Sequence, residues 1–136
     1  MGAFKYIKES FQHSYKTRSD DYRKRITLWR NSNTVTRSEK PTNPVRAREL
    51  GYKAKKGIMI ARVRVLRGKR ARRKASLGRK PGKNVKMMNP GIPLTQIAER
   101  KAIEKFRNMD AVNSYFVGND GSRQYIEVIL REKPAN

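Results

Sequence analysis

Lysine and arginine are the residues whose clustering in this sequence indicates a binding chemistry, namely contact with anionic groups. Residues 53–86 contain 15 of them and no acidic residue, and no aspartate or glutamate lies between Glu49 and Glu99. Each such side chain can meet a phosphate oxygen, and the release of counterions from a polyanion then drives association. A charged surface that serves solubility alone usually mixes both signs. The window therefore predicts contact with a polyanion, with nucleic acid favoured over an anionic membrane surface.

Catalytic and metal-binding chemistry is not indicated by the remaining residue types. His13 is the one histidine, cysteine is absent, and the acidic residues are scattered, mostly beside lysine or arginine. Acid–base catalysis usually needs a pair of tuned groups, and metal sites need clustered ligands. The glycines of residues 68–83 lack the spacing of a phosphate-binding P-loop. We expect a binding or structural protein without enzymatic activity, cofactor, metal or small-molecule substrate.

Composition fits one small domain spanning residues 1–136. Hydrophobic residues make up 36% of the chain and charged residues 33%, with a net charge of +23, so we expect a modest core and strong self-repulsion unless a polyanion neutralises it. No apolar run approaches the roughly 20 residues that span a bilayer. The N-terminus lacks the unbroken apolar stretch of a secretory signal.

Helices are predicted within residues 1–33. Two apolar stripes at helical spacing occur there: Phe4, Ile7 and Phe11, then Tyr22, Ile26 and Trp29. Ser19 is the expected N-cap of the second helix. Residues 38–51 contain two prolines and are expected to form an irregular connection, with a short helix at Val45–Leu50 that Gly51 ends.

A strand is predicted at Gly57–Leu66. One face is apolar throughout, whereas the other begins with isoleucines and ends with Arg62 and Arg64. We interpret it as a strand that enters at the core and leaves at a charged surface.

The C-terminal part predicts a helix followed by a hairpin. A helical stripe begins near Leu94 and consists of Ala98, Ala102, Phe106 and Met109. Two apolar runs, Val112–Val117 and Gln124–Leu130, then flank the turn residues 118–122. The clearest buried face of this hairpin is Ile126, Val128 and Leu130.

Residues 68–93 show no hydrophobic period and few residues that could be buried. Such a segment cannot offset the entropy lost on ordering, so we predict disorder in isolation and order when bound.

Predicted RNA contacts are the basic residues of the 53–86 window. They are Lys53, Lys55, Lys56, Arg62, Arg64, Arg67, Lys69, Arg70, Arg72, Arg73, Lys74, Arg79, Lys80, Lys83 and Lys86. Aromatic rings can also stack on unpaired bases. Tyr52, which lies among lysines, is the candidate for stacking; Tyr115, Phe116 and Tyr125 have core packing as their alternative, which we favour for Phe116.

Several segments resemble the large-subunit ribosomal protein 15e family of archaea and eukaryotes. They are LGYKAKKGIMIARVRVLRG from Leu50, AERKAIEKF with AVNSYFVGNDG and YIEVIL, and the opening MGAFKYIKE. The likeness runs through nearly the whole chain in the same order. Phe116 replaces the family's usual tryptophan, and known members continue beyond residue 136 with a basic tail.

This resemblance implies an α+β fold, with a small, largely antiparallel sheet, packed helices and a long basic loop. Residues 53–67 and 94–131 would form the core, 1–33 the N-terminal helices and 68–93 the loop. The family's role implies a structural constituent of the large ribosomal subunit in the cytoplasmic ribosome, in contact with large-subunit rRNA and neighbouring ribosomal proteins, and not with a membrane. The strand would then anchor the loop and aim it into RNA.

Three other hypotheses compete with an rRNA-binding role. A DNA-binding architectural protein would share the charge, but usually brings a dimer interface or a minor-groove wedge. A membrane-active basic helix fits the moderate amphipathicity of residues 1–30 less well. A nuclease or RNA-modifying enzyme is disfavoured because no catalytic cluster is visible.

Overall fold

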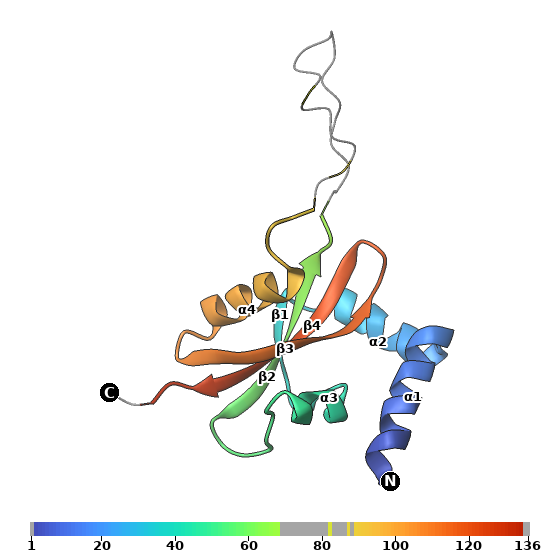
Figure 1. The fold of residues 1–136 in the computed structure, drawn as a ribbon, viewed down its shortest axis with the longest axis horizontal. Helices are drawn as coiled ribbons and strands as arrows, with labels where there is room; N and C mark the ends of the chain where they lie inside the picture. Colours follow the sequence, from blue (N-terminus) through green and yellow to red (C-terminus); the bar gives the residue numbers. More distant parts are fainter. Residues whose placement is uncertain (1, 69–81, 83–86, 88, 135–136) are drawn as a thin grey trace.

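The computed structural model describes residues 2–68, 82, 87 and 89–134. In chain order its elements are α1 (Ala3–Thr17), α2 (Asp20–Asn31), β1 (Val35–Ser38), α3 (Pro44–Glu49), β2 (Ile58–Leu66), α4 (Leu94–Lys105), β3 (Met109–Asn119) and β4 (Arg123–Glu132). The strands form one antiparallel sheet in the order β1-β2-β4-β3 (Figure 1). The expected α+β fold with an antiparallel sheet is therefore confirmed.

The two central strands, β2 and β4, pair along their whole shared length from Ile58↔Arg131 to Leu66↔Arg123. Helix α4 covers one face of the sheet, and α2 and α3 contribute to the core on the other face. Because both faces are covered, the middle of β4 is buried at every position from Tyr125 to Leu130. The chain thus places an apolar run that only Glu127 interrupts in the strand that has neighbours on all sides.

The α4 face carries the larger apolar cluster. It contains the predicted hairpin face Ile126, Val128 and Leu130, each at most 1% exposed. The predicted apolar side of β2 packs there too, together with Ala98 and Ala102 of α4. These assignments are confirmed, and Met109 belongs to the start of β3 instead of the end of the helix.

The opposite face carries an aromatic cluster. Tyr22, Ile26 and Trp29 of α2 pack with Ala47 of α3 and with strand residues Tyr115, Val117, Tyr125 and Ile129. Helix α2 begins as predicted, with the Ser19 side chain accepting a hydrogen bond from the Tyr22 amide at 3.4 Å. Gly118 lets this helix approach β3, because a Cβ there would lie 3.1 Å from both Ile26 and the Tyr22 hydroxyl oxygen.

Helix α1 forms as predicted but has no buried residue. Its stripe remains open, with Phe4 51% and Ile7 39% exposed. The helix contacts the rest through Tyr15, whose ring packs against Tyr22 and Phe116. Arg18, which follows it with φ 52°, donates to both the carbonyl and the side-chain oxygen of Asn119, at 3.0 and 2.8 Å. The amphipathic pattern therefore predicted the helix correctly, although this chain does not bury its apolar side.

Strand β1 was not predicted. Only Val35 among its four residues is both apolar and buried, so the segment offers almost no alternation to detect. Its order comes from pairing with β2, from Val35↔Val63 to Ser38↔Ile60. The short helix predicted at Val45–Leu50 is confirmed as α3, and Gly51 follows it with φ 99°.

The disorder predicted for residues 68–93 falls mostly on residues outside the described part of the chain, and it remains a prediction. Among the residues that are described, no helix is long and apolar enough to cross a membrane.

Candidate nucleic-acid interface

The turn before β2 presents three of the predicted lysines on a fixed backbone. Lys53, Lys55 and Lys56 are all exposed. The Lys55 amide donates to the Lys53 carbonyl at 2.9 Å, and the Glu132 amide of β4 donates to the Gly57 carbonyl at 2.8 Å. Gly57 has φ 81°, a conformation that side chains disfavour, which allows the chain to turn from the lysines directly into the strand. The sheet therefore fixes the backbone that carries these three lysines at one of its ends.

A groove of about 600 Å³ opens beside this turn. Its lining includes the cations Arg37, Lys55 and Lys56, the apolar side chains of Met59 and Phe106, and the carboxylate of Glu132. The cations can meet phosphate oxygens, while the apolar side chains can accept a ribose or a base face. Sequence reasoning did not select Arg37, because the strand that carries it was missed.

Arg64 and Arg67 extend the basic surface along and beyond β2. The Arg64 guanidinium donates to the Arg30 carbonyl at 2.6 Å, and that of Arg67 donates to the Gly121 carbonyl at 3.2 Å. Arg64 is half-buried and Arg67 is exposed. A guanidinium has five N–H donors, so each of these side chains is positioned by one bond and keeps further donors for a ligand.

Arg62 differs from the other predicted contacts because its guanidinium is directed into the protein. It lies opposite Glu127 in the β2–β4 register, and its terminal nitrogen is 3.2 Å from a Glu127 carboxylate oxygen. The Arg62 side chain is 18% exposed and that of Glu127 is fully buried. The guanidinium also lies 4.3 Å from the centre of the Trp29 ring. This placement counts against Arg62 as a phosphate contact. The strand reaches the surface beyond this residue, where Arg64 is half-buried and Leu66 and Arg67 are exposed.

The buried Glu127 carboxylate has several further donors. Tyr115 donates its hydroxyl at 2.6 Å and the Thr42 amide donates at 3.0 Å, and the Thr42 hydroxyl also donates. A buried charge is tolerated when it is paired and hydrogen-bonded in this way. Sequence reasoning missed the network, although a lone glutamate inside the apolar run YIEVIL signals that a cation must lie nearby.

The aromatic candidates divide by burial. Tyr52 is half-buried and packs against the aromatic cluster, so part of its surface remains available. Tyr115 and Tyr125 are buried and pack in the core, so their alternative of core packing holds and neither ring is accessible for base stacking. Phe116 is half-buried and meets Tyr15 edge to face, with ring centres 5.6 Å apart.

Two pKa values reflect this burial. Burial, followed by the nearby Glu127 carboxylate, raises the pKa of the Tyr115 hydroxyl well above its ordinary value. Burial also acts to raise the pKa of Asp120, but hydrogen bonds from Tyr125, the Arg123 amide and Arg30 outweigh it and lower that pKa. Tyr115 therefore stays protonated and Asp120 stays ionised at neutral pH.

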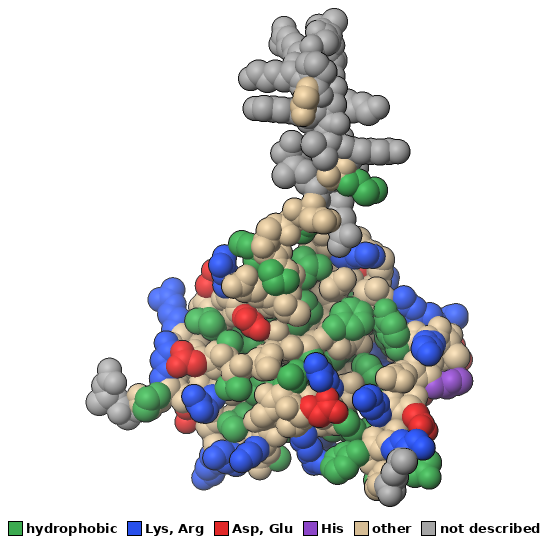
Figure 2. Space-filling model, in the orientation of Figure 1, with side chains coloured by type: hydrophobic (Ala, Val, Ile, Leu, Met, Phe, Trp, Pro, Cys, Tyr) green, Lys and Arg blue, Asp and Glu red, His purple; other side chains and the backbone are tan. Residues whose placement is uncertain are grey.

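Most cations on the described surface have no nearby carboxylate. Nine of the 34 lysines and arginines lie outside the described residues, and only five of the other 25 come within 4.0 Å of a described carboxylate. Figure 2 shows lysine and arginine side chains distributed over the face drawn, with fewer aspartate and glutamate side chains among them. The nine outside are Lys69, Arg70, Arg72, Arg73, Lys74, Arg79, Lys80, Lys83 and Lys86.

A second basic groove, which the sequence did not single out, lies between α2 and the β3–β4 turn. It measures about 300 Å³, and its lining includes three arginines, Arg18, Arg23 and Arg30, together with Asp120, which is paired with Arg30. Within the described ranges, no cluster of histidine, aspartate and glutamate could hold a metal ion.

Comparison with known proteins gives one consistent result. The L15e family model, which is described as Ribosomal L15, matches residues 2–135 of this chain. The protein named large ribosomal subunit protein eL15 from Metallosphaera sedula is 49% identical over 109 residues, which are 79% of this chain and 50% of that protein. Its counterpart of the same name from Methanococcoides burtonii is 42% identical over 129 residues, covering 92% of this chain and 64% of the relative.

A third relative of the same name, from Nanoarchaeum equitans, is 38% identical over 130 residues, covering 96% of this chain and 68% of that protein. The chain thus spans from half to about two thirds of the length of these curated relatives.

Proposed function

Since the chain belongs to the L15e family of ribosomal proteins, we propose that it is a structural constituent of the large subunit in the cytoplasmic ribosome. In this role it binds and stabilises folded large-subunit rRNA and contacts neighbouring ribosomal proteins. No reaction is involved. The relatives' shared name, large ribosomal subunit protein eL15, supports the same assignment.

The observation that carries the RNA-binding part is the excess of unpaired cations on a rigid body. Twenty of the 25 described lysines and arginines lack a described carboxylate within ion-pair distance. Placing so much like charge on a small domain destabilises it unless a polyanion lies against it. An RNA backbone supplies that charge at regular spacing.

The proposed contacts are the lysines of the turn before β2, Arg64, Arg67 and the basic residues from Lys69 to Lys86. The first three fixed lysines would orient the RNA at the groove, with Tyr52 as the nearest candidate for base stacking. Arg62 is excluded from this set because it is paired with Glu127.

Competition between nucleic acids tests the proposal. Full-length chain is bound to a labelled, folded archaeal large-subunit rRNA domain and challenged with duplex DNA or an unrelated structured RNA. We expect the rRNA to be retained when either competitor is in excess. Equal displacement by duplex DNA would instead support the alternative of a DNA-binding architectural protein.

The salt dependence of binding tests the lysines of the turn. Each phosphate contact contributes roughly 0.7 to 0.9 to the slope of log K against log salt. The variant K53Q/K55Q/K56Q should therefore lower the magnitude of that slope by roughly 2 to 3. The control K40Q/K101Q/R107Q removes the same charge from residues outside the proposed contacts. An equal change in both variants would show that the turn is not a specific contact.

A further inference from the structure

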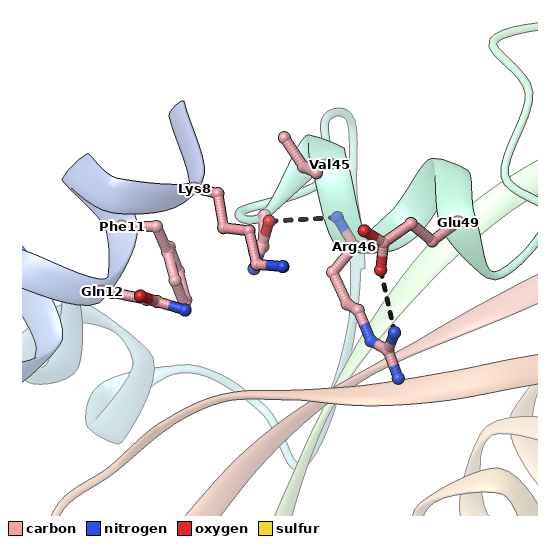
Figure 3. Close-up of a pocket in the computed structure, with 7 residues that line it drawn as sticks. Lys8, Phe11, Gln12, Val45, Arg46 and Glu49 are labelled. Atoms are coloured by element: carbon pink, nitrogen blue, oxygen red, sulfur yellow. Dashed lines mark hydrogen bonds and ion pairs between the residues drawn. The ribbon is translucent and has the colours of Figure 1, made fainter. Parts of the chain in front are cut away.

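A pocket of about 280 Å³ lies between α1 and α3, and it shares no lining residue with the contacts proposed above. Figure 3 shows Lys8, Phe11 and Gln12 reaching from α1 toward α3, which contributes Val45, Arg46 and Glu49. Asn43, the N-cap residue of α3, completes the lining. None of these residues belongs to the basic window from which RNA contacts were predicted.

The apolar walls of the pocket have no role in the core. Phe11 and Val45 are half-buried, and neither belongs to the clusters on the two faces of the sheet. Phe11 continues the exposed stripe of α1, in which Phe4 is 51% exposed and lies beneath the Arg48 guanidinium at 5.4 Å. An aromatic ring that is left accessible beside cations is a suitable surface for stacking.

The polar groups of the pocket offer both donors and acceptors. The Asn43 side-chain oxygen accepts from the Arg46 amide at 3.1 Å, which fixes the orientation of the side chain. The NH₂ group of Asn43 is not used in this bond and can donate to a ligand. Gln12 adds a second, exposed amide. Amide groups of this kind can hydrogen-bond the edge of a nucleobase.

Charge in the pocket is positive by one unit. Arg46 and Glu49 neutralise each other through a 2.8 Å ion pair, whereas Lys8 has no described carboxylate within ion-pair distance. The Lys8 ammonium group lies at the pocket, where, after the Arg46 hydrogen bond, it also helps to lower the pKa of Glu49. It can meet one phosphate there.

We propose that this pocket binds one unpaired nucleotide of RNA. The base lies against Phe11 and Val45, its edge meets the amides of Gln12 and Asn43, and its phosphate meets Lys8. The inference rests on the proposed RNA-binding function and adds a base-reading site to the phosphate contacts. A purely apolar protein segment is a poorer occupant, because it would leave the two amides and the Lys8 ammonium unpaired.

Binding of short single-stranded RNA tests the site directly. Fluorescein-labelled hexamers of A, C, G and U are titrated with the full chain at about 0.3 M salt, where non-specific phosphate binding is weakened. The variant F11A should weaken binding of the preferred hexamer between about fivefold and a hundredfold, the range expected when one stacked base is lost. The matched control is Y6A, which removes an aromatic ring from the same helix outside the pocket and should change affinity by less than about twofold.

Two further variants separate the site from a folding effect. F11L keeps an apolar side chain and should still lose most of the stacking, while circular dichroism shows whether α1 remains. K8Q should lower the magnitude of the salt slope by about one. Equal affinities for wild type, F11A and F11L would overturn the inference. So would a loss of binding to neighbouring ribosomal proteins in F11A with hexamer affinity unchanged, because the occupant would then be a protein.

The outcome is distinct from that of the proposed function. If F11A binds hexamers like wild type while the chain still selects large-subunit rRNA over duplex DNA, only the pocket inference fails. If the wild-type chain shows no such selection but hexamer binding depends on Phe11, only the ribosomal proposal fails.

Discussion

The two faces of the sheet bury different types of side chain. Against α4, the buried side chains of β2 and β4 are aliphatic, such as Val63 and Val128, and carry no polar atoms. On the α2 face, the buried side chains include the aromatic rings of Tyr125 in β4 and Tyr115 in β3, together with the Arg62–Glu127 ion pair. The α4 face is thus held mainly by apolar packing, with hydrogen bonds from Lys105 to the Val35 carbonyl and from Ser114 to Glu99 beside it. The α2 face also contains a buried ion pair with its own set of hydrogen bonds.

The positively charged residues in and just before β2 have two different roles. The lysines before β2 are exposed and face solvent, whereas Arg62, inside the strand, is committed to Glu127 and to the Trp29 ring. An arginine in a basic segment is therefore not automatically a phosphate contact. Its cross-strand neighbour decides whether it serves the fold or a ligand.

The largest expected effect follows from removing one partner of the buried ion pair. E127A leaves the Arg62 charge partly buried and removes the acceptor of Tyr115 and Thr42. We expect the free energy of unfolding to fall by about 3–5 kcal/mol, measured by urea denaturation.

The double variant R62M/E127L is the matched control for the ion pair. It replaces both charges with apolar groups of similar size and should recover much of the loss, because no buried charge is left unpaired. If the loss of unfolding free energy in the double variant equals the sum of the losses in R62M and E127L, the two residues are not coupled.

A smaller effect is expected on the apolar face. V128A removes two methyl groups from a fully buried position and leaves a residual cavity. The free energy of unfolding should fall by about 1–3 kcal/mol. The affinity of the folded variant for rRNA should stay unchanged, because the residue lies away from the basic surface. Thermal unfolding identical to wild type would mean that this face is not the core.

The smallest effect concerns the pH dependence on the ion-pair face. The unfolded chain releases the Tyr115 proton near pH 10, whereas the folded protein keeps it because its pKa is raised. Stability therefore decreases as pH rises above about 10, and Y115F should show a shallower decrease. At neutral pH this variant should lose about 1 kcal/mol through one missing hydrogen bond, since Glu127 retains other donors. If the unfolding free energies of wild type and Y115F change in parallel between pH 9 and 11, Tyr115 is not the group whose titration lowers stability.

Elements with a strong period could be predicted from the sequence. The α2 stripe with its Ser19 cap, the β2 strand and the hairpin face of β4 all repeat apolar residues at a clear spacing, and the structure confirms them. Strand β1 could not be predicted, because its polar residues acquire order only from pairing with β2. Short edge strands are set by their neighbours more than by their own pattern.

The basic character of the candidate interface could be predicted from the sequence, but not all of the residues that belong to it. Charge density alone selected the lysines of the turn, and they are exposed as expected. The same reasoning selected Arg62, because nothing local in the sequence shows that Glu127 lies opposite it 65 positions later. The α1–α3 pocket was likewise invisible, since it joins residues from two separate helices.

Crosslinking to large-subunit rRNA tests the division of charge most directly. The full chain is bound to the folded rRNA, irradiated with ultraviolet light, and the crosslinked amino acids are identified by mass spectrometry. We predict crosslinks at residues 52–56, beside the groove at the start of β2, and none at Arg62 or Trp29. Crosslinks at Arg62 together with an unlabelled turn would contradict the account, because they would place the buried ion-pair face against the RNA.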